Sequence, residues 1–549
     1  MVLLLLLVVA VVVFCYVTVS VVYRIYFHPL AKFPGPKLAA ATGFYETYFD
    51  FALRPGGLFI HQVKKLHDIY GPIVRINPHE IHIDDPAWVD TLYINPSQGV
   101  REKYKPSSDL SGTPRGVFGT VGHEIHRKRR AAISSHFSKA AVTASVPMIY
   151  DKVELLFERM EKQICRQGYC EMRVNYFALA TDTVADHCFA DSTGLLQNEK
   201  AALDWHETIK ALSRIMPLAR QVSWVVPLAL VLPVQLVEFC APSLAKIVKL
   251  HHTMQDQART AAMSLHEVKV DITSSSKPTR GGNVFHSILS NKALGQADKT
   301  YSRMGQEGIV LITAGGETTS RVLATATYHI LANRKTILPL LQQELKSAIP
   351  NPKARVALCD LERLPFLTAI IKESLRIAAV VTSRLPLVAP NQTLRYMDWA
   401  IPSGVRIDPA ASTLVVSWTF IPTKMLQTPV SMTLHNILLD PKIFNEPMEF
   451  RPSRWISSSP ESSLVSSYFL PFGRGSRMCI GMSLAMAQIY ITLASMFRRY
   501  DFELYDTIRE RDLDIIRDCF LGEVQSNTKG VRIKYASTNP QRPASEHPE

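Results

Sequence analysis

Cysteine and charge are both scarce in this chain of 549 residues. The 8 Cys show no paired spacing, which excludes a disulfide-stapled fold and indicates a reducing compartment for the folded part. Charged residues make up 20% of the chain and hydrophobic residues 47%, which excludes a disordered protein. There is no internal repeat. The length allows two to four ordinary domains or one large domain with a single extended core, and a large, mostly helical protein fits that range.

Only one segment is apolar and long enough to cross a membrane. Residues 1–24 carry no charge before Arg24 and consist mostly of Leu and Val, and roughly 20 such residues span a bilayer core. A cleaved signal peptide would need a basic start and a small-residue cleavage site, and neither is clear. Because His28, Lys32 and Lys37 follow directly, the positive-inside rule places the rest of the chain on the cytosolic side.

Two proline-containing stretches follow. Residues 25–45 include Phe33-Pro34-Gly35-Pro36, and we expect a stiff hinge there because Pro fixes φ and cannot continue a helix. Residues 221–237 carry no charge, but Pro227 and Pro233 interrupt them, so a second membrane span is not expected. The segment is either a buried pair of core helices or a surface hairpin that dips into the bilayer.

The remaining chain, residues 46–536, is expected to form one domain with a short strand hairpin followed by helices. Alternating apolar residues predict the hairpin at 74–76 and 81–83. Apolar residues at helical spacing predict helices over 146–165, 174–190, 203–216, 243–268, 302–332, 336–348 and 366–378. A loop is predicted over 271–283 and a disordered tail over 537–549, because both are poor in apolar residues.

The segment Phe472 to Gly481 contains the most informative cysteine. Cys479 has glycines four residues before it and two after it, and a helical pattern follows. A helix N-terminus stabilises a thiolate, and glycines let a bulky planar group approach the backbone. These are the requirements for a thiolate ligand to haem iron. A buried structural Cys before a helix is the alternative interpretation.

This segment resembles the haem-binding loop of cytochrome P450 enzymes. Phe472, Gly475, Arg477, Cys479 and Gly481 match every fixed position of that loop. The resemblance implies a mainly α fold with a small β region, and haem b (iron protoporphyrin IX) with the Cys479 thiolate as axial ligand of the iron. Phe472, Gly475, Arg477 and Gly481 would then belong to the cofactor site.

A second motif, Ala314 to Thr319, contains two adjacent glycines inside a predicted helix. Each costs about 1 kcal/mol relative to Ala, and we expect the pair to let the helix open and to leave room beside it. From the residues alone, a Gly-kinked helix with an exposed ion pair is an alternative. The motif resembles the oxygen-activation segment of P450 enzymes, which implies that Thr318 steadies iron-bound dioxygen and that Glu317 is the proton-relaying acid.

A third motif places Glu373 and Arg376 at i and i+3 of a predicted helix. Such pairs occur on many surface helices. Beside the Cys479 loop, however, this pair resembles the Glu-x-x-Arg pair of the family, which joins an Arg from a later loop. Arg454 is the expected partner, and the three residues would form a buried structural triad of charges.

A basic cluster runs from His126 to Arg130 on a predicted helix. It could be a solvated face, or a nucleic-acid patch that the net charge of +13 would suit. In the family, a Trp or His four residues before an Arg holds the haem propionates, and His126 and Arg130 match that pattern. Arg477 and Arg384 could add guanidinium contacts. The remaining basic residues would face an acidic electron donor, so no nucleic-acid partner is expected.

One segment departs from the family pattern. The 23 residues from Val405 to Gln427 include Trp418 and Phe420 and interrupt what resembles a tight turn between two strands. An apolar insertion there would expose a sticky patch or pack somewhere new. We hypothesise that it is a retained intron, since a Val codon begins with GT, a Gln codon can end with AG and the frame is kept. A genuine substrate-access or partner loop is the alternative.

The resemblance covers the chain from the anchor to about residue 535. It implies a microsomal-type monooxygenase similar to fungal enzymes of secondary metabolism, anchored in the endoplasmic reticulum with its catalytic domain in the cytosol. It would hydroxylate or epoxidise an apolar small molecule, a terpenoid or polyketide by family analogy, using O2. No dinucleotide fingerprint follows a predicted strand, so electrons from NADPH would come through a separate cytochrome P450 reductase, with cytochrome b5 as a further candidate donor.

Two alternatives stay open. A P450-fold isomerase or dehydratase would not need the reductase, although the Glu317-Thr318 pair favours oxygen activation. A non-catalytic haem-binding product of an unspliced transcript has only the 405–427 segment in its support.

Overall fold

The structure is a computed structural model that describes residues 1–109, 112–189, 191–222, 224–270, 283–403, 428–456 and 459–536, without the side chains of 243 and 265–270. The segment 405–427, the predicted tail 537–549 and nearly all of the predicted loop 271–283 lie outside the described residues.

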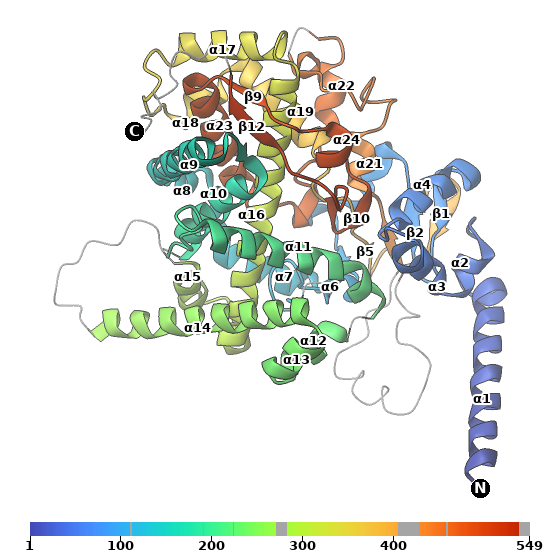
Figure 1. The fold of residues 1–549 in the computed structure, drawn as a ribbon. Coiled ribbons are helices and arrows are strands. Elements are labelled where there is room, and N and C mark those ends of the chain that lie inside the picture. The colour runs from blue at the N-terminus through green and yellow to red at the C-terminus, as the bar shows by residue number, and fades with distance from the viewer. Residues whose placement is uncertain are drawn as a thin grey trace.

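Helices make up most of the described chain (Figure 1). The longer helices are α4 (Phe59–Tyr70), α7 (His123–Ser134), α9 (Val146–Gln167), α10 (Met172–Phe189), α11 (Glu199–Gln221), α14 (Pro242–Val270), α16 (Tyr301–Ala332), α17 (Ile337–Ala348), α19 (Pro365–Ile377) and α23 (Met482–Arg499). Shorter helices are α2 (Lys37–Ala41), α3 (Phe44–Thr47), α5 (Val89–Leu92), α6 (Lys105–Ser108), α8 (Lys139–Ala144), α15 (Val284–Ser290), α18 (Leu358–Glu362), α21 (Leu434–Leu438), α22 (Ser462–Ser467) and α24 (Arg509–Asp512). The seven helices predicted from apolar spacing are confirmed, with ends that differ by a few residues.

The described strands form small sheets in different parts of the molecule (Figure 1). The largest has the order β1-β2-β8-β5-β3. It contains β1 (Ile73–Arg75), β2 (Ile81–Ile83), β8 (Pro429–Ser431), β5 (Leu387–Val388) and β3 (Glu102–Lys103). The predicted hairpin is confirmed, with Val74 opposite His82. The other strands are β4 (Cys170–Glu171), β12 (Arg532–Tyr535) and β9 (Phe502–Leu504) in one sheet, and the pairs β10 (Arg517–Cys519) with β11 (Leu521–Glu523) and β6 (Leu394–Tyr396) with β7 (Trp399–Ile401).

Helix α16 is the centre of the helical part (Figure 1). It begins where the Thr300 side chain accepts the Arg303 N–H, and its 32 residues extend about 48 Å at 1.5 Å per residue. Helices α10, α14, α19 and α23 all pack against it. Because α16 is covered on several sides, it fixes the relative positions of the elements that carry the candidate site.

The glycine pair of α16 serves close packing with α10. A Cβ at Gly316 would overlap Thr181 Oγ1 and lie 2.9 Å from Phe177 Cε2, and a Cβ at Gly315 would overlap Val184 Cγ2. The expectation that the pair leaves room beside the helix is therefore wrong, because α10 fills that room. The conformational cost of two glycines is offset by the contact that they allow between the two helices.

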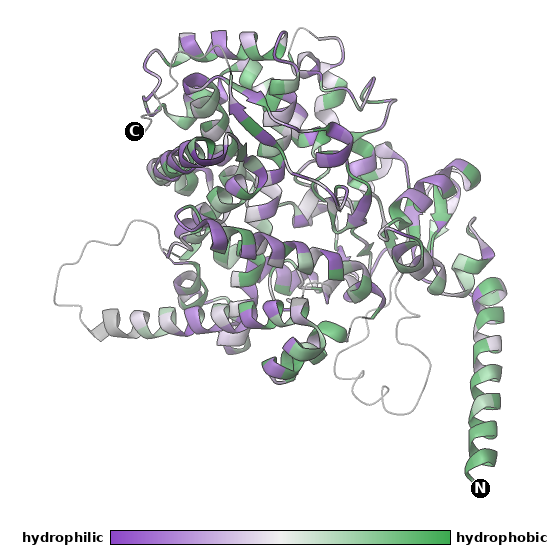
Figure 2. Ribbon diagram, viewed as in Figure 1, coloured by the Kyte–Doolittle hydropathy of each residue, from purple (hydrophilic) through white to green (hydrophobic). Residues whose placement is uncertain are grey.

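Helix α1 (Val2–Val22) stands apart from the globular part. Within Val2–Phe27, a window of 18 residues reaches a mean hydropathy of 3.2, and none of that window is buried. Figure 2 shows α1 as apolar along its whole length, whereas the other helices carry both residue classes. At its base, Arg24 donates to Ala41 O at 2.9 Å, and Arg75 donates to Arg24 O at 2.8 Å. The predicted membrane-spanning candidate is therefore present and joined to the domain by polar contacts.

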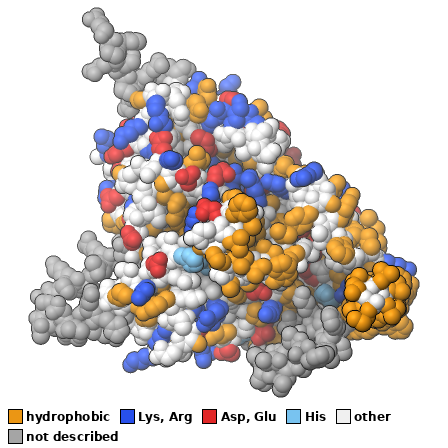
Figure 3. Space-filling view, turned by 60° about the horizontal axis from the view of Figure 1, so that its bottom comes forward, with side chains coloured by type: hydrophobic (Ala, Val, Ile, Leu, Met, Phe, Trp, Pro, Cys, Tyr) orange, Lys and Arg blue, Asp and Glu red, His pale blue; other side chains and the backbone are white. Residues whose placement is uncertain are grey.

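Residues 221–237 extend over the end of α11 and two short surface helices, α12 (Val225–Val231) and α13 (Val234–Cys240). Their inner side chains pack on α14. Their outer side chains are exposed: Trp224 by 63%, Val231 by 84% and Phe239 by 88%. Hydrophobic side chains gather on this face in Figure 3, where α1 appears end-on at its edge. Of the two interpretations of this segment, the surface hairpin is the one that fits.

We expect Gly316→Ala to destabilise the protein, although Ala normally stabilises a helix interior. The added methyl group would collide with Thr181 and Phe177, and overpacking of this kind costs about 1–3 kcal/mol. The free energy of unfolding in urea measures it. Gly295→Ala is the matched control, since nothing lies within 4 Å of its Cβ. Equal stability of the two variants would contradict the packing role.

Candidate active site

The loop before α23 is folded tightly around Cys479. Cys479 N donates to Phe472 O at 2.9 Å, which closes the loop on itself. Gly475 has φ +75°, and a Cβ there would overlap the carbonyl oxygens of Tyr93 and Ile94. Both the backbone conformation and the close approach therefore require glycine at this position.

The Cys479 side chain is exposed, although protein groups surround it on most sides. That combination is typical of a side chain that lines an internal recess. Burial raises the pKa of the Cys479 thiol, while the Gly481 N–H and the charge of Arg130 oppose that rise. Cys15, Cys165, Cys240 and Cys359 are also exposed, so the distinction of Cys479 lies in its surroundings.

A cavity of about 360 Å³ lies between the Cys479 loop and α7. Its lining includes His126, Arg130 and Gly475. His126 is 4% exposed, and burial together with the charges of Arg477 and Arg130 lowers its pKa to about 3. The imidazole is therefore neutral at pH 7 and can donate one N–H to an anion. Arg130 is half-buried, and its charge interacts with Cys479.

Arg477 lies on the inner side of this region. Its two terminal nitrogens each donate at 2.7 Å, to Thr120 O and Val121 O. Its Nε is buried without a partner among the described residues. Burial lowers the pKa of Arg477 to about 10, and Glu102 opposes this in part.

The structure adds Lys103 of β3 to the same region. Lys103 is 6% exposed, and burial followed by the charge of Arg477 lowers its pKa. Nζ donates to Phe118 O at 2.8 Å and lies 3.2 Å from the centre of the Phe118 ring. No local sequence signal distinguishes a buried lysine in a two-residue strand from an exposed one.

These cations fit an anionic cofactor. In the described part of the chain, none of the ion pairs involves Lys103, Arg130 or Arg477. Buried charge without a counter-charge is costly, so the region is suited to an anion with more than one negative group. The two carboxylates of haem, next to an exposed thiol and a loop that tolerates only glycine at 475, meet that requirement.

Arg384 belongs to a different network. Its Nε donates to Glu80 Oε1 at 2.8 Å and one terminal nitrogen donates to Glu46 Oε1 at 2.8 Å. Arg220 of α11 lies 3.6 Å from the same Glu46 oxygen. The two carboxylates raise the pKa of Arg384 further above its usual value. The expected contact between Arg384 and the haem propionates is thus not supported, because its guanidinium is already paired.

One stripe of α16 is less buried than the rest of the helix. Ala314 is exposed and Val310, Thr313 and Thr318 are half-buried, in a helix that is otherwise mostly buried. These residues recur at three- and four-residue spacing and so share one face. Thr318 Oγ1 donates to Ala314 O at 2.7 Å, which keeps the hydroxyl oxygen on that face as an acceptor.

Glu317 points away from the stripe. Its carboxylate accepts from Arg173 of α10 at 2.6 Å and lies 3.1 Å from His206 Nε2 of α11 and 3.7 Å from Arg321. Glu317 is 3% exposed, and the charges of Arg173 and His206 hold its pKa well below the usual range against the effect of burial. In this conformation it is an ionised carboxylate that joins α16 to α10 and α11.

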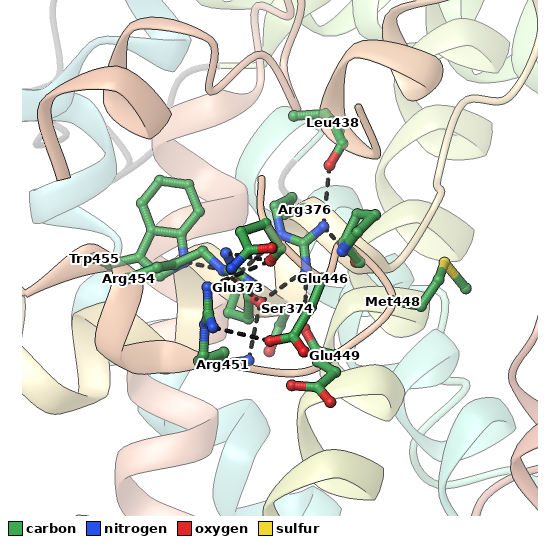
Figure 4. A network of polar contacts seen from close by, with 12 residues as sticks. Glu373, Ser374, Arg376, Leu438, Glu446, Met448, Glu449, Arg451, Arg454 and Trp455 are labelled. Carbon is green, nitrogen blue, oxygen red and sulfur yellow. Dashed lines mark hydrogen bonds and ion pairs between the residues drawn. The ribbon is translucent and has the colours of Figure 1, made fainter. Parts of the chain in front are cut away.

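The structure brings Glu373, Arg376 and Arg454 together (Figure 4). Arg376 donates to both Glu373 oxygens at 2.8 and 2.9 Å, and Arg454 Nε donates to Oε1 at 3.1 Å. Trp455 Nε1 donates to Oε2 at 2.8 Å and the Arg451 N–H to Oε1 at 3.0 Å. The three charged side chains are 0% exposed. The network ties α19 to the segment around 451–455.

We expect Glu373→Ala to be strongly destabilising, because it leaves Arg376 and Arg454 buried without their carboxylate. Breaking such a network by removing one member costs about 3–5 kcal/mol, to be measured as the free energy of unfolding in urea. Glu154→Ala is the control, because Glu154 pairs with Arg499 and is 38% exposed; about 1 kcal/mol or less is expected there. Similar losses in both variants would contradict the role of the triad.

Comparisons with known proteins agree with this geometry. The family profile described as "Cytochrome P450" matches residues 51–417 and 419–518. Tryptophan 6-hydroxylase fscE of Fusarium equiseti is 36% identical over 511 residues, which cover 93% of each chain. Cytochrome P450 monooxygenase MO6277 of Ascocoryne sarcoides is 34% identical over 515 residues, 93% of this chain and 95% of that protein. N-acetyltryptophan 6-hydroxylase ivoC of Emericella nidulans is 33% identical over 515 residues, 93% of each chain.

Proposed function

Because the chain belongs to the cytochrome P450 family and its relatives are fungal P450 monooxygenases, we propose that it hydroxylates or epoxidises an apolar small molecule. The oxidant is O2, and the electrons come from NADPH through cytochrome P450 reductase, with cytochrome b5 as a further candidate donor. The single observation that carries the proposal is the exposed Cys479 thiol in its glycine-bearing loop, beside buried Lys103 and half-buried Arg130 and Arg477, none of which forms an ion pair among the described residues.

Cys479 would hold the haem iron through its thiolate, and haem b supplies the oxygen-activation chemistry when bound. His126, Arg130, Arg477 and Lys103 would hold the two haem carboxylates. Phe472 lies at the start of the loop. Gly475 lets the loop approach the carbonyl oxygens of Tyr93 and Ile94, and Gly481 leaves space beside Cys479 Sγ for a planar group.

Thr318 and Glu317 have different parts in the proposal. The Thr318 hydroxyl accepts a hydrogen bond on the substrate side of α16 while donating its own proton to Ala314 O. Glu317, ionised and paired with Arg173, could relay protons as a catalytic acid only after its carboxylate leaves that pair. In the conformation described here, Glu317 joins α16 to α10 and α11.

We propose two candidate classes of substrate. Family analogy favours a terpenoid or polyketide. Two of the relatives are named as hydroxylases of tryptophan and N-acetyltryptophan, so an indole-containing amino acid is the second candidate substrate class. Half-buried Phe118 and Phe520, whose ring centroids are 5.7 Å apart, are suited to either an aromatic or an aliphatic ring.

The location that we propose is the endoplasmic reticulum membrane, with α1 as a single span and the catalytic domain in the cytosol. The apolar face of α12 and α13 would rest on the same bilayer, since Trp224, Val231 and Phe239 are exposed on the face whose edge carries α1 (Figure 3). Protease treatment of sealed microsomes tests this orientation: the domain should be digested and α1 protected.

The test of the proposed activity is the carbon monoxide difference spectrum of the reduced protein. We expect the red-shifted band of a thiolate-bound haem, and its absence from every form of the chain would overturn the proposal. The spectrum is recorded with and without Val405 to Gln427, which we propose to be a retained intron. A band only after the deletion supports that proposal, and a band of equal size in the full chain shows that the segment is part of a working enzyme.

Lys103→Met should change two properties in opposite directions. It removes a buried charge that has no carboxylate partner, so the protein without haem should become more stable. The same change removes a donor to a haem carboxylate, and haem affinity should fall about tenfold. Urea unfolding and titration with haem measure the two effects. Exposed Lys105 supplies the control, Lys105→Met, and unchanged haem affinity in Lys103→Met would contradict the role of Lys103.

A further inference from the structure

The segment Thr113–Val121 lies directly on the end of the exposed stripe of α16. A Cβ at Gly116 would be 3.1 Å from Val310 Cγ2 and 3.3 Å from Gln306 O. Val310 is one turn before Ala314, on the same face of the helix. The segment therefore covers one end of the exposed stripe to which Ala314 and Thr318 belong.

Two consecutive side chains of α16 hold the backbone of this segment. Gln306 Oε1 accepts the Arg115 N–H at 2.9 Å. Glu307 accepts the Val117 N–H at 3.1 Å through Oε2 and 3.4 Å through Oε1. The segment is thus attached through alternate backbone donors, and its path depends on where the two side chains place their oxygens.

Glu307 is a fully buried charge. It is 0% exposed and pairs with Arg303, also 0% exposed, at 2.7 Å. Burial raises the pKa of Glu307, while Arg303 and the Val117 N–H oppose that rise. Arg303 Nε and one terminal nitrogen have no partner among the described residues. A buried ion pair that is incompletely satisfied contributes little net stability, so its main effect is to fix the position of the carboxylate.

The opposite edge of the segment is held by residues of the proposed haem site. Lys103 donates to Phe118 O, and Arg477 donates to Thr120 O and Val121 O. Between these attachments, the Phe118 ring meets Phe520 edge-on at 5.7 Å. Phe520 itself has φ +72°, an unusual conformation for a bulky residue that is often found at functional sites.

We propose that Glu307 is a positioning residue that determines how the substrate is oriented. Through the Val117 N–H it fixes the Thr113–Val121 segment, and with it the Phe118 ring, over the reactive face of α16. Glu307 contacts no reacting atom and supplies no proton. The inference deepens the proposed monooxygenase function and rests on it, but the contact between Glu307 and Val117 can be tested without any catalytic turnover.

The first measurement is hydrogen exchange of the Val117 amide in the full-length protein. The double variant Arg303→Met with Glu307→Met removes both charges together, so that no unpaired buried charge remains. We expect the exchange of Val117 to accelerate about tenfold or more, since it loses a hydrogen bond to a charged acceptor. Glu307→Gln keeps an oxygen acceptor and should restore most of the protection.

A second measurement distinguishes a specific effect on the position of the Thr113–Val121 segment from a general loosening of the protein structure. Imidazole and 4-phenylimidazole are titrated into the haem-containing protein, and their Kd values are read from the Soret shift. We expect the double variant to bind imidazole as the parent does and to change the Kd of the larger 4-phenylimidazole by about tenfold. Asp182→Asn is the matched control, because buried Asp182 accepts the N–H groups of Leu195 and Leu196 at 2.9 Å in another part of the fold.

The proposal is overturned if Val117 exchange is unchanged in the double variant, if both azoles change by the same factor, or if Asp182→Asn has the same effect. Should the double variant fail to fold, Glu307→Asp takes its place. It keeps the charge and withdraws the oxygens by one methylene, so Val117 exchange should again rise, and an unchanged rate overturns the proposal. Lack of the carbon monoxide band in the parent would instead count against the proposed function, whereas the exchange result would stand.

Discussion

Pairing of buried charge is the constraint on which this structure depends. The buried carboxylates of Glu307, Glu317 and Glu373 each pair with at least one arginine. Glu317 joins α16 to Arg173 of α10, and Glu373 joins α19 to Arg454, whereas Glu307 pairs with Arg303 of its own helix and reaches a distant segment through the Val117 N–H. Such groups are costly to bury unless their partners are held in good geometry. Lys103 is buried and Arg477 is half-buried, and neither forms an ion pair in the described part of the chain. The buried carboxylates that connect the helices are thus paired with arginines, whereas positive charge is in excess beside Cys479.

Each face of helix α16 makes a different set of contacts. Gly315 and Gly316 bring α10 close, Glu317 reaches α10 and α11, and Ala314 and Thr318 lie on a less buried stripe. Near its N-terminal end, Gln306 and Glu307 hold the segment that covers the stripe. Successive side chains of a helix point about 100° apart. Adjacent residues of α16 can therefore face different neighbours, and residues with packing, ionic and catalytic roles can follow one another in sequence.

The sequence predicted the parts of the molecule whose signals are local. The spacing of apolar residues identified the long helices, and the five matched positions around Cys479 lie within ten residues of one another. Glu373 and Arg376 are also close in sequence, but their link to Arg454 depended on the family resemblance. Lys103 gave no signal, because its burial results from contacts with Phe118 and Arg477 that are distant in sequence.

The sequence also did not predict the direction in which charged side chains point. Glu317 is next to Thr318 in sequence, yet its carboxylate belongs to the interface with α10 and α11. Arg384 has the right residue type for a propionate contact but is already paired with Glu46 and Glu80. The sequence identified both charged residues, but it did not show which partners they contact, because those partners are brought close only by the tertiary structure.

The contact between Gly316 and Thr181 also constrains how relatives of this protein can diverge. Because the Cβ of any larger residue at 316 would occupy the place of the Thr181 hydroxyl, position 316 can change only if position 181 becomes smaller or α10 shifts outward. A shift of α10 would in turn move Arg173 away from Glu317. These positions should therefore covary: a homologue with a side chain at 316 should have either a smaller residue at 181 or no arginine at 173.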